Sequence, residues 1–190
     1  MPAPAPNEYP EALFVRVSDN IQATELTRGP WSHGVMHGGP ICGLLAWVIE
    51  NRLDRDDLVC SRLTVEILSG VPVEVLETSS EIIKNGKRTA VVQSSISQHG
   101  KVLARATSQW LSPPERLHTN SESVAEIPSE RANPGAHPDV DYPRPGFNAD
   151  AVDLRVIRGS TEEPGPGLIW IRLDHPLVAG ESPSKFQQIS

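Results

Sequence analysis

The sequence has little cysteine and no basic or apolar segment that would direct it to a membrane. Of its 190 residues only two are cysteines, Cys42 and Cys60, and they offer no spacing for a disulfide framework or a zinc cage. We therefore expect no metal and no cofactor, and this cysteine usage fits a reducing compartment.

Positive charge is also scarce, since the formal net charge is -7. Nucleic-acid surfaces need clustered Lys and Arg, so no nucleic-acid partner is expected. The N-terminal "MPAPAPNEYPEA" lacks the basic region and apolar core of a signal peptide. The longest apolar run, residues 40–49, is shorter than the roughly 20 residues that span a bilayer. These features predict a cytoplasmic protein without membrane insertion.

Short strand-like runs dominate residues 12–111. "ALFVRVSDNIQATEL" contains two such runs around a polar turn, and "SRLTVEIL" alternates apolar and polar residues as a half-buried strand does. The further runs are "VEVLETSSEII", "RTAVVQSSISQ" and "KVLARATSQWL". Asn85-Gly86 predicts a type I′ hairpin, in which both residues have positive φ, and His99-Gly100 predicts a second hairpin. We expect the last four strands to form an antiparallel meander.

One helix is predicted among these strands, from about Pro40 to Leu53, with proline at the first helical position. It is apolar nearly all round, which indicates burial on most sides. A sheet that curls around this helix would bury it, so the expected fold is α+β: a hotdog, a curled antiparallel sheet around a central helix. The core-facing stripe is Ile41, Leu44, Leu45, Val48 and Ile49.

The composition changes after residue 112. Seven prolines fall between Pro113 and Pro145, and few large apolar residues accompany them. We interpret residues 113–150 as a Pro-rich linker, since such a segment cannot offset its ordering entropy. Residues 151–190 then contain two more strand-like runs. The predicted division is a first hotdog domain at 1–112, this linker, and an incomplete second hotdog.

The order of elements, together with "HGGP", "RLTVEILSGVPVEVLE", "NGKRTAVVQSSI" and "GKVLARATSQWL", resembles the N-terminal half of double-hotdog acyl-coenzyme A thioesterases of the thioesterase II type. The tail "IWIRLDHPLVAGESPS" resembles the start of that family's second repeat. The resemblance implies a hydrolase of fatty acid metabolism that cleaves an acyl-CoA thioester. It also implies that repeats pair, so we expect a homo-oligomer.

The candidate catalytic residues are His37, Gly38 and Gly39, at the start of the helix. Unpaired N–H groups and the helix dipole there can stabilise an oxyanion, and glycine lets a ligand approach closely. The resemblance implies the same use of a backbone amide, and His37 is a candidate to orient the loop or the carbonyl. A purely structural interpretation also stands, in which the glycines only form a turn and His37 only bonds to the loop. His33 is interpreted as a loop residue and Cys42 as core.

A catalytic acid is missing from the first repeat. In single-domain hotdog thioesterases it lies about two turns beyond the glycine, and here that count reaches Ala46 and Trp47. Glu50 is too far along and is interpreted as the solvated helix end. The resemblance places the water-activating Asp, with Gln and Thr or Ser partners, in the second repeat. Asp174 and His175 precede its helix and are not a dyad.

Three functions remain open from the sequence. The first is an acyl-CoA thioesterase, for which we expect weak or no hydrolysis if the 190 residues are the whole chain. The alternative is a non-catalytic acyl-CoA-binding or assembly module, which the missing acid favours. A hotdog dehydratase fits less well, because its chemistry pairs a His with an acid and no acid adjoins His37.

Overall fold

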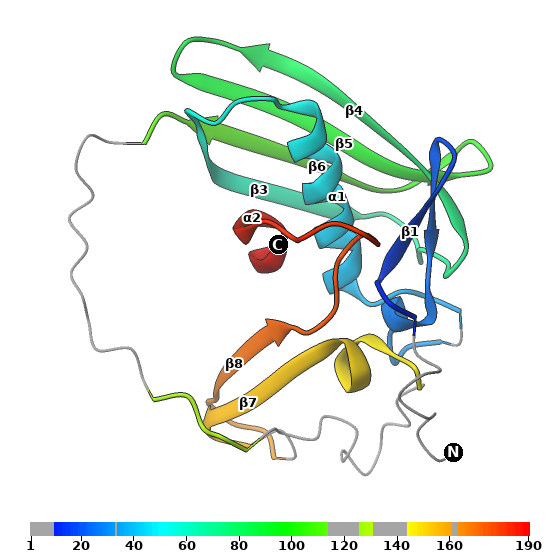
Figure 1. Cartoon of the computed structure of the whole chain (residues 1–190), viewed down its shortest axis with the longest axis vertical. Coiled ribbons are helices and arrows are strands. Elements are labelled where there is room, and N and C mark those ends of the chain that lie inside the picture. The colour runs from blue at the N-terminus through cyan, green and yellow to red at the C-terminus, as the bar shows by residue number, and fades with distance from the viewer. Residues whose placement is uncertain (1–9, 33, 114–125, 131–143, 161–162) are drawn as a thin grey trace.

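A computed structural model describes residues 10–32, 34–113, 126–130, 144–160 and 163–190 of the chain. A six-stranded antiparallel sheet curls around one long helix, and a two-stranded hairpin and a short helix lie beside them (Figure 1). The sheet strands are β1 (Phe14–Val17), β2 (Asn20–Ala23), β3 (Val59–Ile67), β4 (Val75–Asn85), β5 (Thr89–Gln98) and β6 (Lys101–Leu111). The other elements are α1 (Gly38–Arg52), β7 (Val152–Arg158), β8 (Leu168–Leu173) and α2 (Lys185–Ile189). Two single turns, Glu25–Thr27 and Phe147–Ala151, complete the structure.

The strand order in the large sheet is β1-β2-β4-β5-β6-β3. Strands β4, β5 and β6 form the expected meander, but β3 pairs with β6 at the far edge and not with β4. The connection from β3 to β4 therefore crosses the sheet, and the loop before α1 holds it in place. The Met36 N–H donates to Val71 O at 2.8 Å, and the Val73 N–H donates to Gly34 O at 2.8 Å. The prediction of a four-strand meander was wrong for β3.

Helix α1 is buried on nearly every side, as predicted. All five residues of the predicted stripe are buried, and so are Ala46 and Trp47 on the other side of the helix. Each large apolar side chain contributes about 2 kcal/mol by leaving water. The helix begins at Gly38 rather than Pro40, because the residue before Gly38 caps it. The continuous apolar run of the sequence is thus the core of the domain.

The His99-Gly100 hairpin is confirmed. His99 has φ 51° and Gly100 has φ 74°, and they link Gln98 of β5 directly to Lys101 of β6. Positive φ at both central residues is the requirement of a type I′ turn, whose twist matches that of the flanking strands.

The type I′ prediction for Asn85-Gly86 was wrong. Neither residue has positive φ, and β5 does not begin until Thr89. The wider turn is held by Arg55, which donates to Asn85 Oδ1 at 2.8 Å, to Gly86 O at 3.3 Å and to Lys87 O at 3.2 Å. These bonds satisfy turn carbonyls from a loop 30 residues away, so tertiary contact overrides the local preference.

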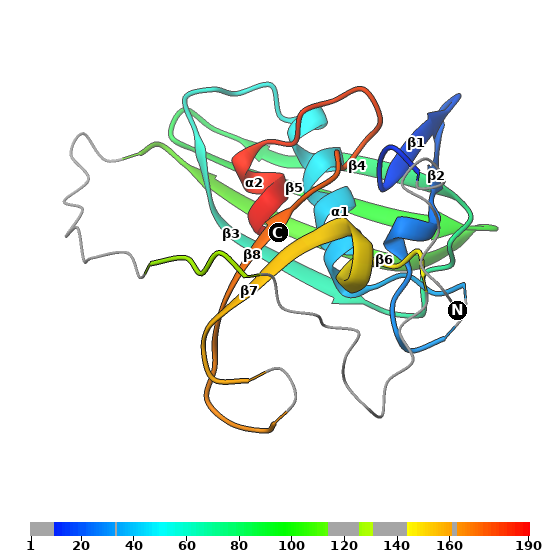
Figure 2. The ribbon, with the colours of Figure 1, turned by 60° about the horizontal axis from the view of Figure 1, so that its bottom comes forward.

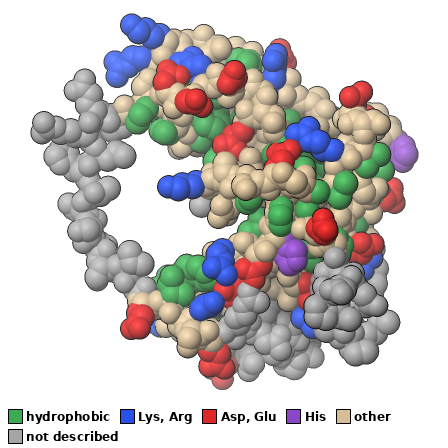
Figure 3. Space-filling view, in the orientation of Figure 1, with side chains coloured by type: hydrophobic (Ala, Val, Ile, Leu, Met, Phe, Trp, Pro, Cys, Tyr) green, Lys and Arg blue, Asp and Glu red, His purple; other side chains and the backbone are tan. Residues whose placement is uncertain are grey.

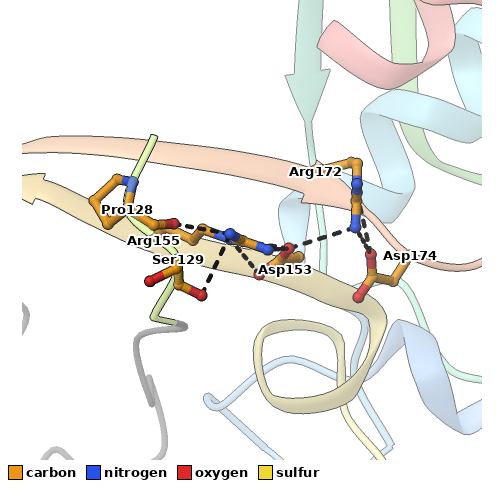
Figure 4. A network of polar contacts seen from close by, with 6 residues as sticks. All are labelled: Pro128, Ser129, Asp153, Arg155, Arg172 and Asp174. Atoms are coloured by element: carbon orange, nitrogen blue, oxygen red, sulfur yellow. Dashed lines mark hydrogen bonds and ion pairs between the residues drawn. The ribbon is translucent and has the colours of Figure 1, made fainter. Parts of the chain in front are cut away.

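Hairpin β7–β8 forms a separate antiparallel sheet with one apolar and one polar face. The polar face centres on the fully buried carboxylate of Asp153 (Figure 4). Arg155 Nη2 donates to Asp153 Oδ2 at 2.8 Å, and Arg172 Nη2 lies 3.4 Å from the same oxygen. Arg172 Nη2 also donates to Asp174 Oδ1 at 3.1 Å, so Asp174 pairs with an arginine. The buried charge is therefore paired, as burial requires.

Arg155 also holds a piece of the predicted linker against this hairpin. Its Nη1 donates to Pro128 O at 2.8 Å and to Ser129 O at 3.4 Å (Figure 4). The rest of the predicted linker between residues 113 and 144 lies mostly outside the described residues. On β8, Leu168, Ile169 and Ile171 are exposed, and Figure 3 shows hydrophobic side chains on the surface of this hairpin.

The segment after β8 docks onto the first repeat. The Phe14 N–H donates to Leu177 O at 2.9 Å, which makes residues 176–179 a neighbour of β1. Glu181 then accepts from the Trp47 indole at 2.8 Å and from Arg16 at 2.7 Å. Burial raises the pKa of the Glu181 carboxyl, but these hydrogen bonds outweigh burial and hold it below its usual value. Figure 2 shows the resulting position of α2 alongside α1.

Glu50 is not a solvated helix end, so that interpretation was wrong. Its carboxylate accepts from Ser184 Oγ at 2.7 Å and from Gln187 Nε2 at 2.7 Å. Ser184 and Gln187 also form the capping box at the start of α2. Glu50 thus joins the end of α1 to the start of α2.

The whole arrangement is an α+β hotdog with a partial second repeat.

Candidate functional site

The first turn of α1 is organised by His37, which is its N-cap residue. His37 has φ -70° and ψ 155°, and its Nδ1 accepts a hydrogen bond from the Gly39 N–H at 3.1 Å. The His37 N–H in turn donates to Thr27 O at 2.8 Å, which fixes the entry of the chain into the helix. The structural role predicted for His37 is therefore present.

Gly38 carries the one N–H of this turn that is available to a ligand. The Gly39 N–H is held by His37, and Pro40 has no N–H. None of the described residues accepts a hydrogen bond from the Gly38 N–H. The positive end of the helix dipole adds to its potential. The two glycines are thus different: Gly38 presents a donor, and Gly39 does not.

A cavity of about 340 Å³ opens beside this donor. Among the described residues, most side chains that line it are apolar, and His37 and Gly38 are also part of the lining. The cavity is lined by Trp31, Val35, Met36, His37, Gly38, Ile41, Ile67, Gly70 and Val71.

Phe147 closes the opposite side of the first turn. Its ring stacks on His37 with a centroid distance of 5.0 Å and an interplanar angle of 23°, and its N–H donates to Arg28 O at 3.0 Å. A Cβ on Gly39 would lie 2.8 Å from Phe147 Cε1, so a larger residue there would require the Phe147 ring to shift. A second cavity, of about 290 Å³, lies on this side, between Gly39, Phe147 and the apolar face of β7–β8.

The His37 imidazole is set up to be neutral. Burial lowers its pKa below the ordinary value of 6.5, because the cation would lose solvation. A neutral imidazole that accepts at Nδ1 carries its proton on Nε2, so its other nitrogen is a donor. His37 and Gly38 line the same cavity, so the Nε2–H of His37 is a second candidate hydrogen-bond donor there.

Acid will weaken this cap. Burial lowers the pKa of His37, so the folded chain binds a proton on this imidazole less tightly than the unfolded chain does. The contribution of the His37 cap to the free energy of unfolding is therefore complete above the unfolded pKa of about 6.5. It is lost as the pH falls through the lower pKa of the folded chain. We expect His37→Asn, which caps without titrating, to lose less stability between about pH 7.5 and pH 5. Thermal unfolding of both proteins across this range measures the difference, and parallel curves would contradict the assignment.

The remaining predicted residues lie away from the cavity. Burial raises the pKa of the Cys42 thiol, which argues against a nucleophile, but Cys42 is half-buried and not a residue of the buried core. Ala46 and Trp47 are core residues, and His33 lies outside the described residues. Sequence reasoning missed Phe147, which falls inside the predicted linker, and Trp31. An aromatic residue amid proline and polar residues was the only available signal for Phe147.

The described residues show no group of three His, Cys, Asp or Glu side chains arranged to hold a metal ion. Within the same residues, neither helix has the length and apolar character needed to cross a membrane.

Comparison with known proteins finds one family model that matches part of the chain. Residues 27–110 match the model of the acyl-CoA thioesterase N-terminal domain. A conserved protein of unknown function with a hot dog fold from Alicyclobacillus acidocaldarius is similar in structure (TM-score 0.61, 17% identity, 86% of this chain and 61% of that chain). The tesB protein of Mycobacterium avium subs paratuberculosis is also similar (TM-score 0.55, 15% identity, 90% of this chain and 60% of that chain). The chain thus spans about 60% of each relative's length. No curated protein matches the sequence.

Proposed function

We propose that the chain binds an acyl-CoA thioester and takes part in its hydrolysis to free acid and CoA, because residues 27–110 match the model of the acyl-CoA thioesterase N-terminal domain. One observation carries the proposal. Gly38, whose N–H no described residue engages, lines an apolar cavity at the positive end of α1. We also propose the division into a first hotdog domain, a linker and part of a second hotdog.

During thioester hydrolysis, negative charge develops on the carbonyl oxygen of the substrate. Water attacks the thioester carbonyl carbon, the carbonyl oxygen becomes an oxyanion, and the C–S bond then breaks to release CoA as its thiol after protonation. The Gly38 N–H and the His37 Nε2–H are the donors proposed for that oxyanion. Such a preorganised donor contributes about 10²–10³-fold to the rate.

The attacking water must be activated by a group from another part of the protein. None of the described residues that line the cavity beside Gly38 carries a carboxylate. His37 does not serve as the base, because its Nδ1 is engaged by Gly39 and its Nε2 carries the proton. The proposed contribution of this chain is thus to hold the acyl group and polarise its carbonyl.

The same lack of a carboxylate among the cavity-lining residues favours a second candidate, a non-catalytic acyl-CoA-binding or assembly module. It would hold the thioester in the same orientation without cleaving it. Turnover, rather than affinity, separates the two functions.

The test is an assay of the full chain on acetyl-, butyryl-, octanoyl- and palmitoyl-CoA, with release of the free thiol as readout. We expect octanoyl-CoA to bind, with slow thiol release if the chain is a thioesterase and none if it is a binding module. Calorimetry with the S-octyl thioether of CoA, which cannot be hydrolysed, measures binding separately. Absence of both binding and release would refute the proposal.

A further inference from the structure

We propose that Trp31 determines acyl-chain length, by covering the part of the chain that extends beyond the cavity next to Gly38. This inference rests on the proposed function. Trp31 is 77% exposed, whereas Trp47 and Trp110 are 5% and 7% exposed. An indole of this size left open to water at the rim of an apolar cavity is a surface that an apolar ligand can cover.

The indole is held at the rim by the loop before α1. The Gly29 N–H donates to Val35 O at 2.9 Å, and the Val35 N–H donates to Ser32 O at 3.3 Å, so the loop turns back on itself. A Cβ on Gly29 would lie 3.2 Å from Trp31 Cδ1. One edge of the indole therefore lies close to Gly29.

The cavity connects this indole to the carbonyl donor. Ile67 is 49% exposed and lines the cavity together with Trp31 and Gly38. Its Cδ1 lies 3.8 Å from the position of a Cβ on Gly38. Groups next to a thioester carbonyl bound at Gly38 would thus lie near Ile67, in a cavity that Trp31 also lines.

The cavity beside Gly38 suits the acyl chain better than the pantetheine arm of CoA. The pantetheine arm contains amides that need hydrogen-bond partners when they leave water. Val35, Ile67 and Val71 offer no side-chain donor or acceptor. A methylene chain needs none, and each buried methylene raises affinity about four-fold. The geometry therefore favours long acyl groups over acetyl.

The experiment uses the full chain and two probes, the S-octyl and S-ethyl thioethers of CoA, with tryptophan emission and calorimetry as readouts. We expect the octyl probe, but not the ethyl probe or CoA, to shift emission to the blue. Trp31→Phe should remove the shift and keep the affinity, because it retains an aromatic ring. Trp31→Ala should weaken octyl binding about ten-fold and leave ethyl binding unchanged. Ile83→Ala, which removes an exposed apolar side chain outside the cavity lining, should change neither.

Equal octyl affinity of the wild type and Trp31→Ala would overturn the proposal. So would a blue shift that appears with protein concentration alone, because a second copy of the chain would then cover the indole. These outcomes are distinct from failure of the proposed function. If octyl binding depends on Trp31 but no thiol is released, Trp31 contacts the acyl chain in a protein that binds acyl-CoA without cleaving it. If thiol release does not depend on Trp31, the thioesterase function stands and the role of Trp31 is refuted.

Discussion

Replacing Gly38 with proline will lower the rate of thioester hydrolysis by about 10²–10³-fold, because it deletes the backbone N–H that is proposed, together with the His37 Nε2–H, to stabilise the oxyanion. Proline is well tolerated at the first helical position, which Gly38 occupies. The preceding residue, His37, has φ -70° and ψ 155°, which is a conformation that a residue before proline adopts readily. The substitution thus removes a donor and preserves the entry into α1.

Gly38→Ala is the matched control. It keeps the N–H, and the added Cβ meets only Ile67 Cδ1 at 3.8 Å, an ordinary contact. Thiol release from octanoyl-CoA by the three proteins measures the effect, with thermal unfolding as the check on folding. The S-octyl thioether, which lacks the carbonyl, should bind Gly38→Pro and Gly38→Ala equally. Equal rates for the two variants would show that the amide does not act on the carbonyl.

Replacing Gly39 with alanine will lower the free energy of unfolding by about 1–3 kcal/mol. The new Cβ would lie 2.8 Å and 2.9 Å from Phe147 Cε1 and Cζ, so the ring must move. Movement of the ring separates it from the His37 imidazole, on which it stacks at 5.0 Å. Chemical denaturation measures the loss. Gly38→Ala is again the control, since the same change one residue earlier meets no such contact.

The cause can be isolated with Phe147→Ala. In that background the ring is gone, and Gly39→Ala should cost at least about 1 kcal/mol less than it does in the wild type. Strictly additive losses would mean that Gly39 is required for its backbone and not for the approach of Phe147.

The core of this fold could be predicted because its signals are local. The apolar character of α1 and the His99-Gly100 turn depend on residues adjacent in the sequence, and both were confirmed. The place of β3 beside β6 and the wide turn at Asn85 could not be predicted. The first depends on contacts of the crossing loop with residues 34–36, and the second on Arg55, which reaches the turn from another loop.

The position of the candidate site could be predicted from the sequence, but its geometry could not. His37, Gly38 and Gly39 do come together at the start of α1, but only the structure distinguishes the amide held by His37 from the amide left to a ligand. Phe147 lies more than a hundred residues from His37 in the sequence, and no local pattern joins them. Glu50 looked solvated because its partners, Ser184 and Gln187, are equally remote. The predicted homo-oligomer remains a prediction.

The central claim is that the Gly38 N–H binds the carbonyl of an acyl thioester. The most direct measurement is the ¹H–¹⁵N spectrum of the labelled chain with two analogues of octanoyl-CoA: a ketone in which a methylene replaces the sulfur, and the S-octyl thioether without the carbonyl. We predict that the ketone moves the Gly38 amide proton downfield further than that of Gly39, and that the thioether does not. A Gly38 resonance that stays in place while other cavity amides respond to the ketone would contradict the claim.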